Sequence, residues 1–324
     1  MTTLSSPQKI IGNFKGKDII SLDQFSQKDL ELLFSHIKKM KKICLTQAPS
    51  KVLGGKIVTL LFYEPSSRTF GSFSASIKQL GGQTVEIQNP QQFSSVSKGE
   101  TLEDTIRVFE AYSDAIVIRH PEAGTAQKAA NAAFFIPVIN AGDGTGEHPT
   151  QALLDMYTIY EKFGRLDNLR ILFAGDMLYG RTVHSLIRGL SLFKNNKVFL
   201  LSPKELRLSR EDFSNFSKRG IKLTGINNEK DIPKNADVWY WTRVQKERFK
   251  SLKDYERVKN RFIVTPQMLK KYGNKEMILM HPLPRVGEIA TEVDNDSRSV
   301  YLRSEIRNGM YVRMALLALV LGRI

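Results

Sequence analysis

Four adjacent polar residues, Ser66 to Thr69, follow an apolar run and could together bind a phosphate-sized dianion. They lie in YEPSSRTF (63–70), directly after KIVTLLF (56–62), which is typical of a buried strand. A helix predicted to begin near Ser66 would present first-turn amides and the positive end of its dipole. Three hydroxyl groups and the Arg68 guanidinium would add further donors for phosphate oxygens. Taken alone, an ordinary serine cap beside a surface arginine explains the stretch equally well.

Polar residues with similar chemistry follow other apolar runs along the chain. They are Arg119, His148, Gln151, Arg181, Arg243, Gln245 and the proline-flanked loop MHPLPRVGE (280–288). Ligands of open α/β sheets bind beyond the carboxyl ends of the strands. A single arginine in such a place is usually an exposed ion pair that contributes little to stability. The joint occurrence of these residues therefore predicts one shared pocket for polyanionic ligands.

The apolar pattern also predicts the elements that would position these residues. Strands are predicted at 56–63, 114–120, 134–142, 170–176 and 197–203, and a strand followed by a loop within each of 236–244 and 276–284, with helical sequence between most of them. This alternation predicts an α/β fold with two doubly wound parallel-sheet domains. A long helix from about His148 to Gly164 would bridge residues 1–149 and 150–304, and the apolar carboxy-terminal helix would return 305–324 to the first domain.

Composition limits the classes of partner. The 324 residues include 48 Lys and Arg against 33 Asp and Glu, a formal net charge of +15. The basic residues are spread along the chain without the aromatic-interleaved motifs of a nucleic-acid module, so we expect a basic solvated surface and no nucleic-acid partner. The longest apolar run, near the end of the sequence, is too short to span a bilayer, and the amino-terminal stretch lacks the pattern of a secretion signal. We therefore expect no membrane association. The single cysteine, Cys44, excludes an internal disulfide and fits a cytoplasmic protein.

Seven segments, taken in order, resemble the aspartate carbamoyltransferase family of the aspartate/ornithine carbamoyltransferase superfamily. They are EPSSRT, VIRHPEAG, INAGDGTGEHPTQALLD, GDMLYGRTVHSL, TRVQKERF, HPLPRVGEI and NGMYVRMALL, and the resemblance runs from the amino-terminal region to the last helix, over nearly the whole chain. The resemblance implies transfer of a carbamoyl group from carbamoyl phosphate to the amino group of L-aspartate, a step of pyrimidine biosynthesis. It implies no metal and no organic cofactor, with carbamoyl phosphate bound by the first domain and aspartate by the second.

The resemblance also implies a role for each candidate residue. Ser66, Ser67, Arg68 and Thr69 match the phosphate-binding motif, and Arg119, His148 and Gln151 match the groups around the carbamoyl end. Arg181, Arg243 and Gln245 match residues that bind the two carboxylates of aspartate. Leu283 would place its backbone carbonyl near the reacting nitrogen, and Pro284 would shape that loop. Arg68, Thr69, Arg119, His148 and Lys98 are the catalytic candidates, and the departing phosphate is expected to take the proton.

SSVSKGETLEDT (94–105) resembles the family loop that reaches into the active site of a neighbouring subunit. Lys98 matches the lysine of that loop, and either Ser94 or Ser95 matches its serine. This implies a homotrimer with shared active sites, whereas the residues alone are equally typical of a solvated polar loop. Phe70 and Ser74 stand where the family often has arginine and glutamate, so we expect local packing and subunit contacts to differ. The sequence leaves open whether regulatory or other pyrimidine-pathway chains bind.

Three alternatives remain at this point. An ornithine carbamoyltransferase often has cysteine in place of Pro282, and Arg243 and Lys98 here favour a dicarboxylic acceptor instead. A nucleotide-binding protein would use GDMLYGRT (175–182), which has P-loop spacing but bulky residues in the phosphate cradle. A non-catalytic relative with the same fold would not need the complete set of polar site positions.

Overall fold

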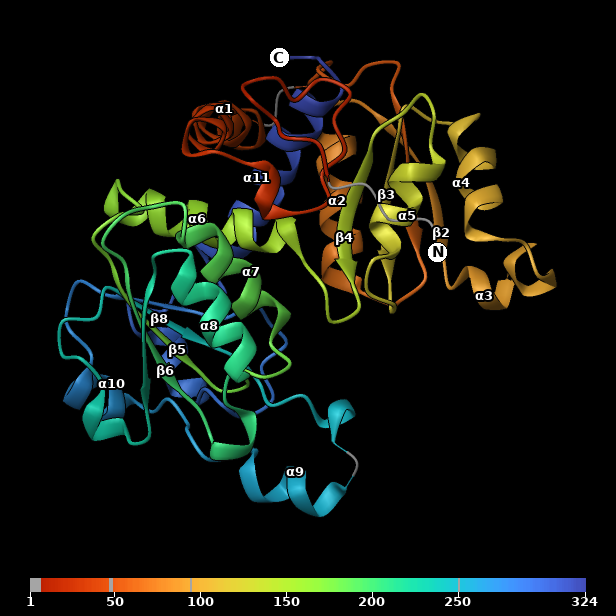
Figure 1. Ribbon diagram of the computed structural model, residues 1–324. Coiled ribbons are helices and arrows are strands. Elements are labelled where there is room, and N and C mark those ends of the chain that lie inside the picture. Colours follow the sequence, from red (N-terminus) through yellow and green to blue (C-terminus); the bar gives the residue numbers. More distant parts are fainter. Residues whose placement is uncertain (1–6, 47–48, 94, 250) are drawn as a thin grey trace. The chain divides into compact units, whose positions relative to one another are not determined.

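The computed structural model describes residues 7–46, 49–93, 95–249 and 251–324 (Figure 1). The chain divides into two compact units, one with residues up to Leu154 together with Asn308–Ile324 and one with Asp155–Arg307. Each unit contains one sheet whose described strand pairs are all parallel. The predicted α/β class with two parallel-sheet domains is therefore confirmed.

The sheet of the first unit has the order β2-β1-β3-β4. Its strands are β1 (Ile57–Phe62), β2 (Gln83–Gln88), β3 (Ala115–His120) and β4 (Val138–Asp143). Its helices are η1 (Leu22–Gln24), α1 (Gln27–Thr46), α2 (Ser67–Gln79), α3 (Pro90–Phe93), η2 (Ser95–Lys98), α4 (Leu102–Glu110), α5 (Thr125–Ala132) and most of α11 (Ser304–Val320). Helices α4 and α5 cover one face of this sheet, and α2 lies on the other (Figure 1). The apolar residues of β1, β3 and β4 are buried because helices cover both faces.

The sheet of the second unit has the order β7-β6-β5-β8-β9. Its strands are β5 (Arg170–Ala174), β6 (Lys197–Leu201), β7 (Lys222–Ile226), β8 (Val238–Trp241) and β9 (Ile278–Met280). Its helices are α7 (Arg181–Leu190), η3 (Lys204–Leu206), α8 (Arg210–Lys218), η4 (Glu229–Asp231), η5 (Lys246–Arg248), α9 (Leu252–Val258), α10 (Pro266–Tyr272) and η6 (Thr291–Asn295). Trp239 and Trp241 of β8 are fully buried in its core. Helix α6 (Pro149–Phe163) crosses the division between the units at Leu154 and Asp155.

The last helix packs on the first unit through the helix that follows β1. The Ser76 hydroxyl of α2 donates a hydrogen bond to the Met310 carbonyl at 3.1 Å. The buried Arg313 guanidinium donates to the Ser72 hydroxyl at 2.9 Å and lies over the Phe73 ring. These contacts join α11 to α2, so the carboxy-terminal helix returns to the first unit as predicted.

Two strands and several strand boundaries differ from the sequence prediction; β5 and β6, for example, end at Ala174 and Leu201, two residues before their predicted ends. Strands β2 and β7 were not predicted, because both lie at sheet edges and alternate polar with apolar residues instead of forming an apolar run. The strand predicted over 134–142 begins only at Val138. The Glu110 carboxylate accepts hydrogen bonds from the amides of Phe134, Phe135 and Ile136, which holds those residues in a loop.

The described residues contain no candidate for a membrane span and none for a metal site built from several side chains. No helix within 7–46, 49–93, 95–249 and 251–324 is both long and apolar enough to cross a membrane. In the same part of the chain, no cluster of three or more His, Cys, Asp or Glu side chains could hold a metal ion.

Candidate active site

Strand order brings three of the predicted groups in the first unit to one edge of its sheet. Ser66 to Thr69 follow β1, Arg119 lies in β3, and His148 follows β4. Strand β3 pairs with both β1 and β4, so these groups leave neighbouring strands at their carboxyl ends. The amide of Tyr63 donates to the Arg119 carbonyl at 2.8 Å, which extends the pairing of β1 and β3 up to the polar residues.

Helix α2 begins where the phosphate-binding motif was predicted. Ser66 is its N-cap, with extended backbone (φ −157°, ψ 90°), and the Phe70 amide donates to the Ser66 carbonyl at 3.0 Å. In the described part of the chain, the Ser66 side chain makes no hydrogen bond to the first turn. Thr69 is buried, whereas Ser67 and Arg68 are exposed. This helix start combines hydroxyl groups, an exposed guanidinium and the positive end of the dipole, which together suit an anion.

The Arg119 guanidinium is almost completely buried and held in place from two sides. Its Nη2 lies 2.7 Å from Oε2 of Glu64, and its Nη1 donates to the Ala141 carbonyl at 3.1 Å. The side chain of Arg119 is only 8% exposed. Sequence reasoning assigned no role to Glu64, although this residue lies within the stretch 63–70 that we singled out. Burial keeps this cation in a fixed orientation and strengthens its field on any neighbouring ligand.

Gly142, at the end of β4, is the residue against which Arg119 and His148 both pack. A Cβ at this position would lie 2.7 Å from Nη1 of Arg119 and 3.5 Å from Cδ2 of His148. Gly142 has a φ of +116°, which side-chain-bearing residues rarely adopt. Its amide donates to Oδ1 of Asn140 at 2.7 Å, which fixes the turn. The structure therefore brings Arg119 and His148 together, and it does so through a glycine that the sequence analysis did not single out.

The loop between β4 and α6 holds His148 at the start of that helix. Oδ1 of Asp143 accepts from the Glu147 amide at 2.8 Å, and its Oδ2 accepts from the Gly124 amide at 3.0 Å. His148 is buried, and its carbonyl accepts from the Gln151 amide at 3.0 Å. Gln151 is half-buried in the first turn of α6, one helical turn from His148.

The predicted neighbouring-subunit loop follows β2, the edge strand that pairs with β1. Ser95 and Lys98 form the two ends of η2, which follows β2 and α3 at the edge of the first sheet (Figure 1). Both side chains are exposed. Ser94 lies outside the described residues.

In the second unit, three neighbouring strands deliver the remaining candidates to one sheet edge. Arg181 begins α7 after β5, Arg243 and Gln245 follow β8, and the loop with Leu283 and Pro284 follows β9. Strand β8 pairs with both β5 and β9. Arg181, Arg243, Gln245 and Leu283 are half-buried, and Pro284 is exposed.

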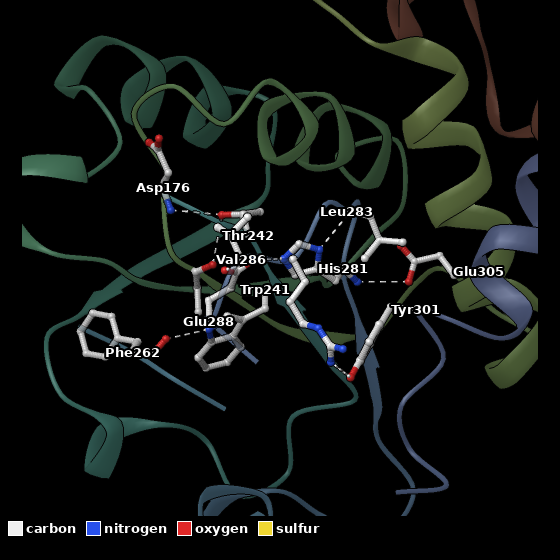
Figure 2. A network of polar contacts seen from close by, with 12 residues as sticks. Asp176, Trp241, Thr242, Phe262, His281, Leu283, Val286, Glu288, Tyr301 and Glu305 are labelled. Atoms are coloured by element: carbon white, nitrogen blue, oxygen red, sulfur yellow. Dashed lines mark hydrogen bonds and ion pairs between the residues drawn. The ribbon is translucent and has the colours of Figure 1, made fainter. Parts of the chain in front are cut away.

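Hydrogen bonds join the loop after β5 to the loop after β8. Nε2 of Gln245 donates to the Tyr179 carbonyl at 2.9 Å. The Asp176 amide donates to Oγ1 of Thr242 at 3.1 Å (Figure 2). Asp176 is fully buried, and burial raises the pKa of its carboxyl although amides of the loop oppose this. These hydrogen bonds hold the two loops together. Arg181 and Arg243 therefore follow neighbouring strands, β5 and β8, through loops that contact each other.

The stretch 175–182 does not form a phosphate cradle. Four of its amides donate to protein acceptors at 2.9–3.0 Å: those of Gly175, Met177, Tyr179 and Arg181. The Met177 side chain is fully buried in the second unit. A P-loop needs its amides directed at the ligand, so this geometry disfavours nucleotide binding there.

Comparisons with known proteins agree with this arrangement. Residues 17–161 match the family "Aspartate/ornithine carbamoyltransferase, carbamoyl-P binding domain", and residues 167–320 match "Aspartate/ornithine carbamoyltransferase, Asp/Orn binding domain". The chain is 44% identical over 304 residues to the aspartate carbamoyltransferase catalytic subunit of Methanobrevibacter smithii, covering 94% of each chain. It is 47% identical over 307 residues to the multifunctional protein pyr1-3 of Dictyostelium discoideum, covering 95% of this chain but only 14% of that protein's length.

A solved structure extends the similarity to the fold. The structure of aspartate transcarbamoylase from Trypanosoma cruzi in complex with carbamoyl phosphate and aspartate has a TM-score of 0.87 and 37% sequence identity with this chain. The match covers 95% of this chain and 96% of that one.

Proposed function

Because the chain belongs to the aspartate/ornithine carbamoyltransferase family, we propose that it transfers the carbamoyl group of carbamoyl phosphate to the amino group of L-aspartate. The amine nitrogen forms a bond to the carbonyl carbon, and the bond from that carbon to the phosphate oxygen breaks. The phosphate leaves with the electron pair and takes one proton from the amine, giving N-carbamoyl-L-aspartate for pyrimidine biosynthesis. The observation that carries this proposal is the packing of Arg119 and His148 against Gly142, with Arg119 on the strand that pairs with β1, after which α2 begins.

The first unit supplies the groups for carbamoyl phosphate. Ser66, Ser67, Arg68 and Thr69 bind the phosphate through hydroxyl groups, first-turn amides and the Arg68 guanidinium. Arg119 and His148 donate hydrogen bonds to the carbonyl oxygen, where negative charge grows as the tetrahedral intermediate forms, and Gln151 contacts the carbamoyl end. Each well-placed donor of this kind is worth about 3–4 kcal/mol of barrier. The buried, doubly held Arg119 supports this role because little reorganisation is needed during the reaction.

The second unit supplies the groups for aspartate. Arg181 and Arg243 bind its two carboxylates, since the guanidinium fork pairs with a carboxylate through two hydrogen bonds, and Gln245 adds a neutral contact. The Leu283 carbonyl faces the reacting nitrogen, and Pro284 shapes the loop. We accordingly assign carbamoyl-phosphate binding to residues 1–149 with 305–324, and aspartate binding to 150–304.

The exposed position of Lys98 supports a site shared between subunits. Lys98 and a serine of its loop, Ser94 or Ser95, would reach a neighbouring chain and add a cation for the anionic substrates. The smallest active assembly would be a homotrimer. The cytoplasm is its proposed location, because one unpaired cysteine suits a reducing compartment.

We expect the chain to carbamoylate aspartate and to leave ornithine essentially unreacted. Arg243 and Arg181 attract the side-chain carboxylate of aspartate and repel the side-chain ammonium group of ornithine. The measurement is product formation from carbamoyl phosphate with each amino acid at equal concentration. A preference for ornithine would reject aspartate as the substrate, and the same preparation without an amino acid serves as the blank.

We expect two inactive variants to restore activity when they are mixed. Lys98→Ala removes the group that a chain lends to its neighbour, and Arg243→Ala removes a group that it uses itself. In mixed trimers some sites pair an intact loop with an intact second unit, so part of the wild-type turnover should return after dissociation and reassembly. Mass spectrometry verifies that mixed trimers are present; their inactivity would contradict a shared site.

A further inference from the structure

His281, at the end of β9, is a fully buried histidine that the proposed chemistry does not use directly. Its Nδ1 lies 2.8 Å from the Leu283 amide nitrogen, and its Nε2 lies 2.6 Å from Oε1 of Glu288 (Figure 2). Its own amide donates to Oε2 of Glu305 at 3.1 Å. The ring is thus held at both nitrogens and the backbone is held at a third point.

These contacts define which ring nitrogen carries the proton. A backbone amide can only donate, so Nδ1 of His281 must accept from Leu283 and cannot be protonated. The proton of the neutral ring therefore lies on Nε2, which donates it to Glu288. Burial alone would raise the pKa of Glu288, but hydrogen bonds with His281 and the Val286 amide outweigh it and hold that pKa below its ordinary value. Glu288 accordingly stays ionised and keeps the proton on Nε2.

The residue that His281 contacts has an unusual backbone. Leu283 has a φ of +54°, which residues other than glycine seldom adopt outside special turns. Such a conformation persists only where the surrounding structure fixes it. The hydrogen bond to Nδ1 fixes the plane of the peptide that precedes Leu283, and the direction of the Leu283 carbonyl depends on that plane.

Glu288 closes the loop from the other end. It is 5% exposed, and its second oxygen accepts from the Val286 amide at 3.0 Å. The pair of His281 and Glu288 therefore spans residues 281–288 and restrains both sides of Leu283 and Pro284.

We propose that His281, oriented by Glu288, is a positioning residue that aims the Leu283 carbonyl at the reacting nitrogen. This inference rests on the proposed function, in which that carbonyl contacts the attacking amine. His281 itself touches no substrate; it acts by accepting one hydrogen bond from the loop that does.

The test compares two conservative replacements that each keep a different half of the ring's function. Asparagine places an acceptor where Nδ1 stands but cannot reach Glu288, whereas glutamine places a donor near Nε2 and offers no acceptor to Leu283. We expect His281→Gln to lower kcat at least about tenfold with the KM for carbamoyl phosphate changed by less than about twofold. We expect His281→Asn to retain most of kcat. His36→Gln, in α1, is the control for loss of a histidine elsewhere.

A merely structural pair predicts the opposite order, because His281→Asn leaves the Glu288 carboxylate buried without its donor. Retention of kcat by His281→Gln, or a lower kcat for Asn than for Gln, therefore overturns the proposal. Both His281 replacements are then combined with Glu288→Gln, which removes the buried charge. The proposal also fails if, in this background, kcat of His281→Asn is no higher than kcat of His281→Gln. It fails as well if His281→Asn folds neither alone nor together with Glu288→Gln. Absence of carbamoyl aspartate from the wild type would instead reject the proposed function.

Discussion

Replacing Arg68 by alanine is expected to lower kcat by about 100- to 1,000-fold and to leave the protein folded. The Arg68 guanidinium stands in the first turn of α2, where the phosphate is proposed to bind, and its charge would stabilise phosphate as it departs. Its side chain is exposed, and exposed side chains away from special features contribute little to stability. Steady-state kinetics with both substrates near saturation and a thermal melt measure the two effects separately.

Two further variants sharpen this experiment. Arg68→Lys keeps the charge but loses the planar fork, so we expect activity between wild type and alanine. Arg210→Ala removes another exposed arginine from the first turn of a helix, α8, and should leave kcat unchanged. Turnover close to wild type in Arg68→Ala would remove Arg68 from the proposed mechanism.

Replacing Gly142 by alanine is expected to lower kcat about 100-fold or more. The new Cβ would lie 2.7 Å from Nη1 of Arg119, too close for both groups to remain, and 3.5 Å from His148. Its φ of +116° would also strain alanine by about 1–3 kcal/mol. Because Arg119 must move away from the developing oxyanion, we expect the loss mainly in kcat, with a lower melting temperature beside it.

A control substitution at another glycine of the first unit separates the effect of backbone strain from the effect of displacing Arg119. Gly55 also has a positive φ, +75°, but a Cβ there meets nothing within 4 Å. Gly55→Ala should therefore lower the melting temperature without changing kcat. Equal kinetic effects of the two substitutions would show that the contact with Arg119 is unimportant.

The sequence was sufficient to predict which strand ends carry the candidate residues. Apolar runs identified β1, β3, β4 and the central strands of the second sheet, and parallel pairing then placed residues such as Arg119 and Arg243 at carboxyl edges. These predictions succeeded because buried parallel strands are nearly continuous apolar runs, and because the carboxyl ends of parallel strands lie at the same edge of the sheet.

The residues that orient the candidate side chains could not be predicted from the sequence. Glu64 contacts Arg119, and Gly142 packs against Arg119 and His148. Glu288 accepts a hydrogen bond from His281. The type of a residue does not show which distant residue it will contact. Edge strands β2 and β7 were missed for a related reason: half of their residues face solvent, so their pattern is weak. Tertiary contacts, not local propensity, decide such cases.

The contacts between α11 and α2 have a consequence for synthesis of the protein. Ser76 and Ser72 lie 234 and 241 positions before their partners Met310 and Arg313. A ribosome that has already translated α2 must still produce all of Asp155–Arg307 before that helix can contact α11. The second unit, continuous in the chain, can mature on the emerging polypeptide, while the first waits for translation to pass Arg313.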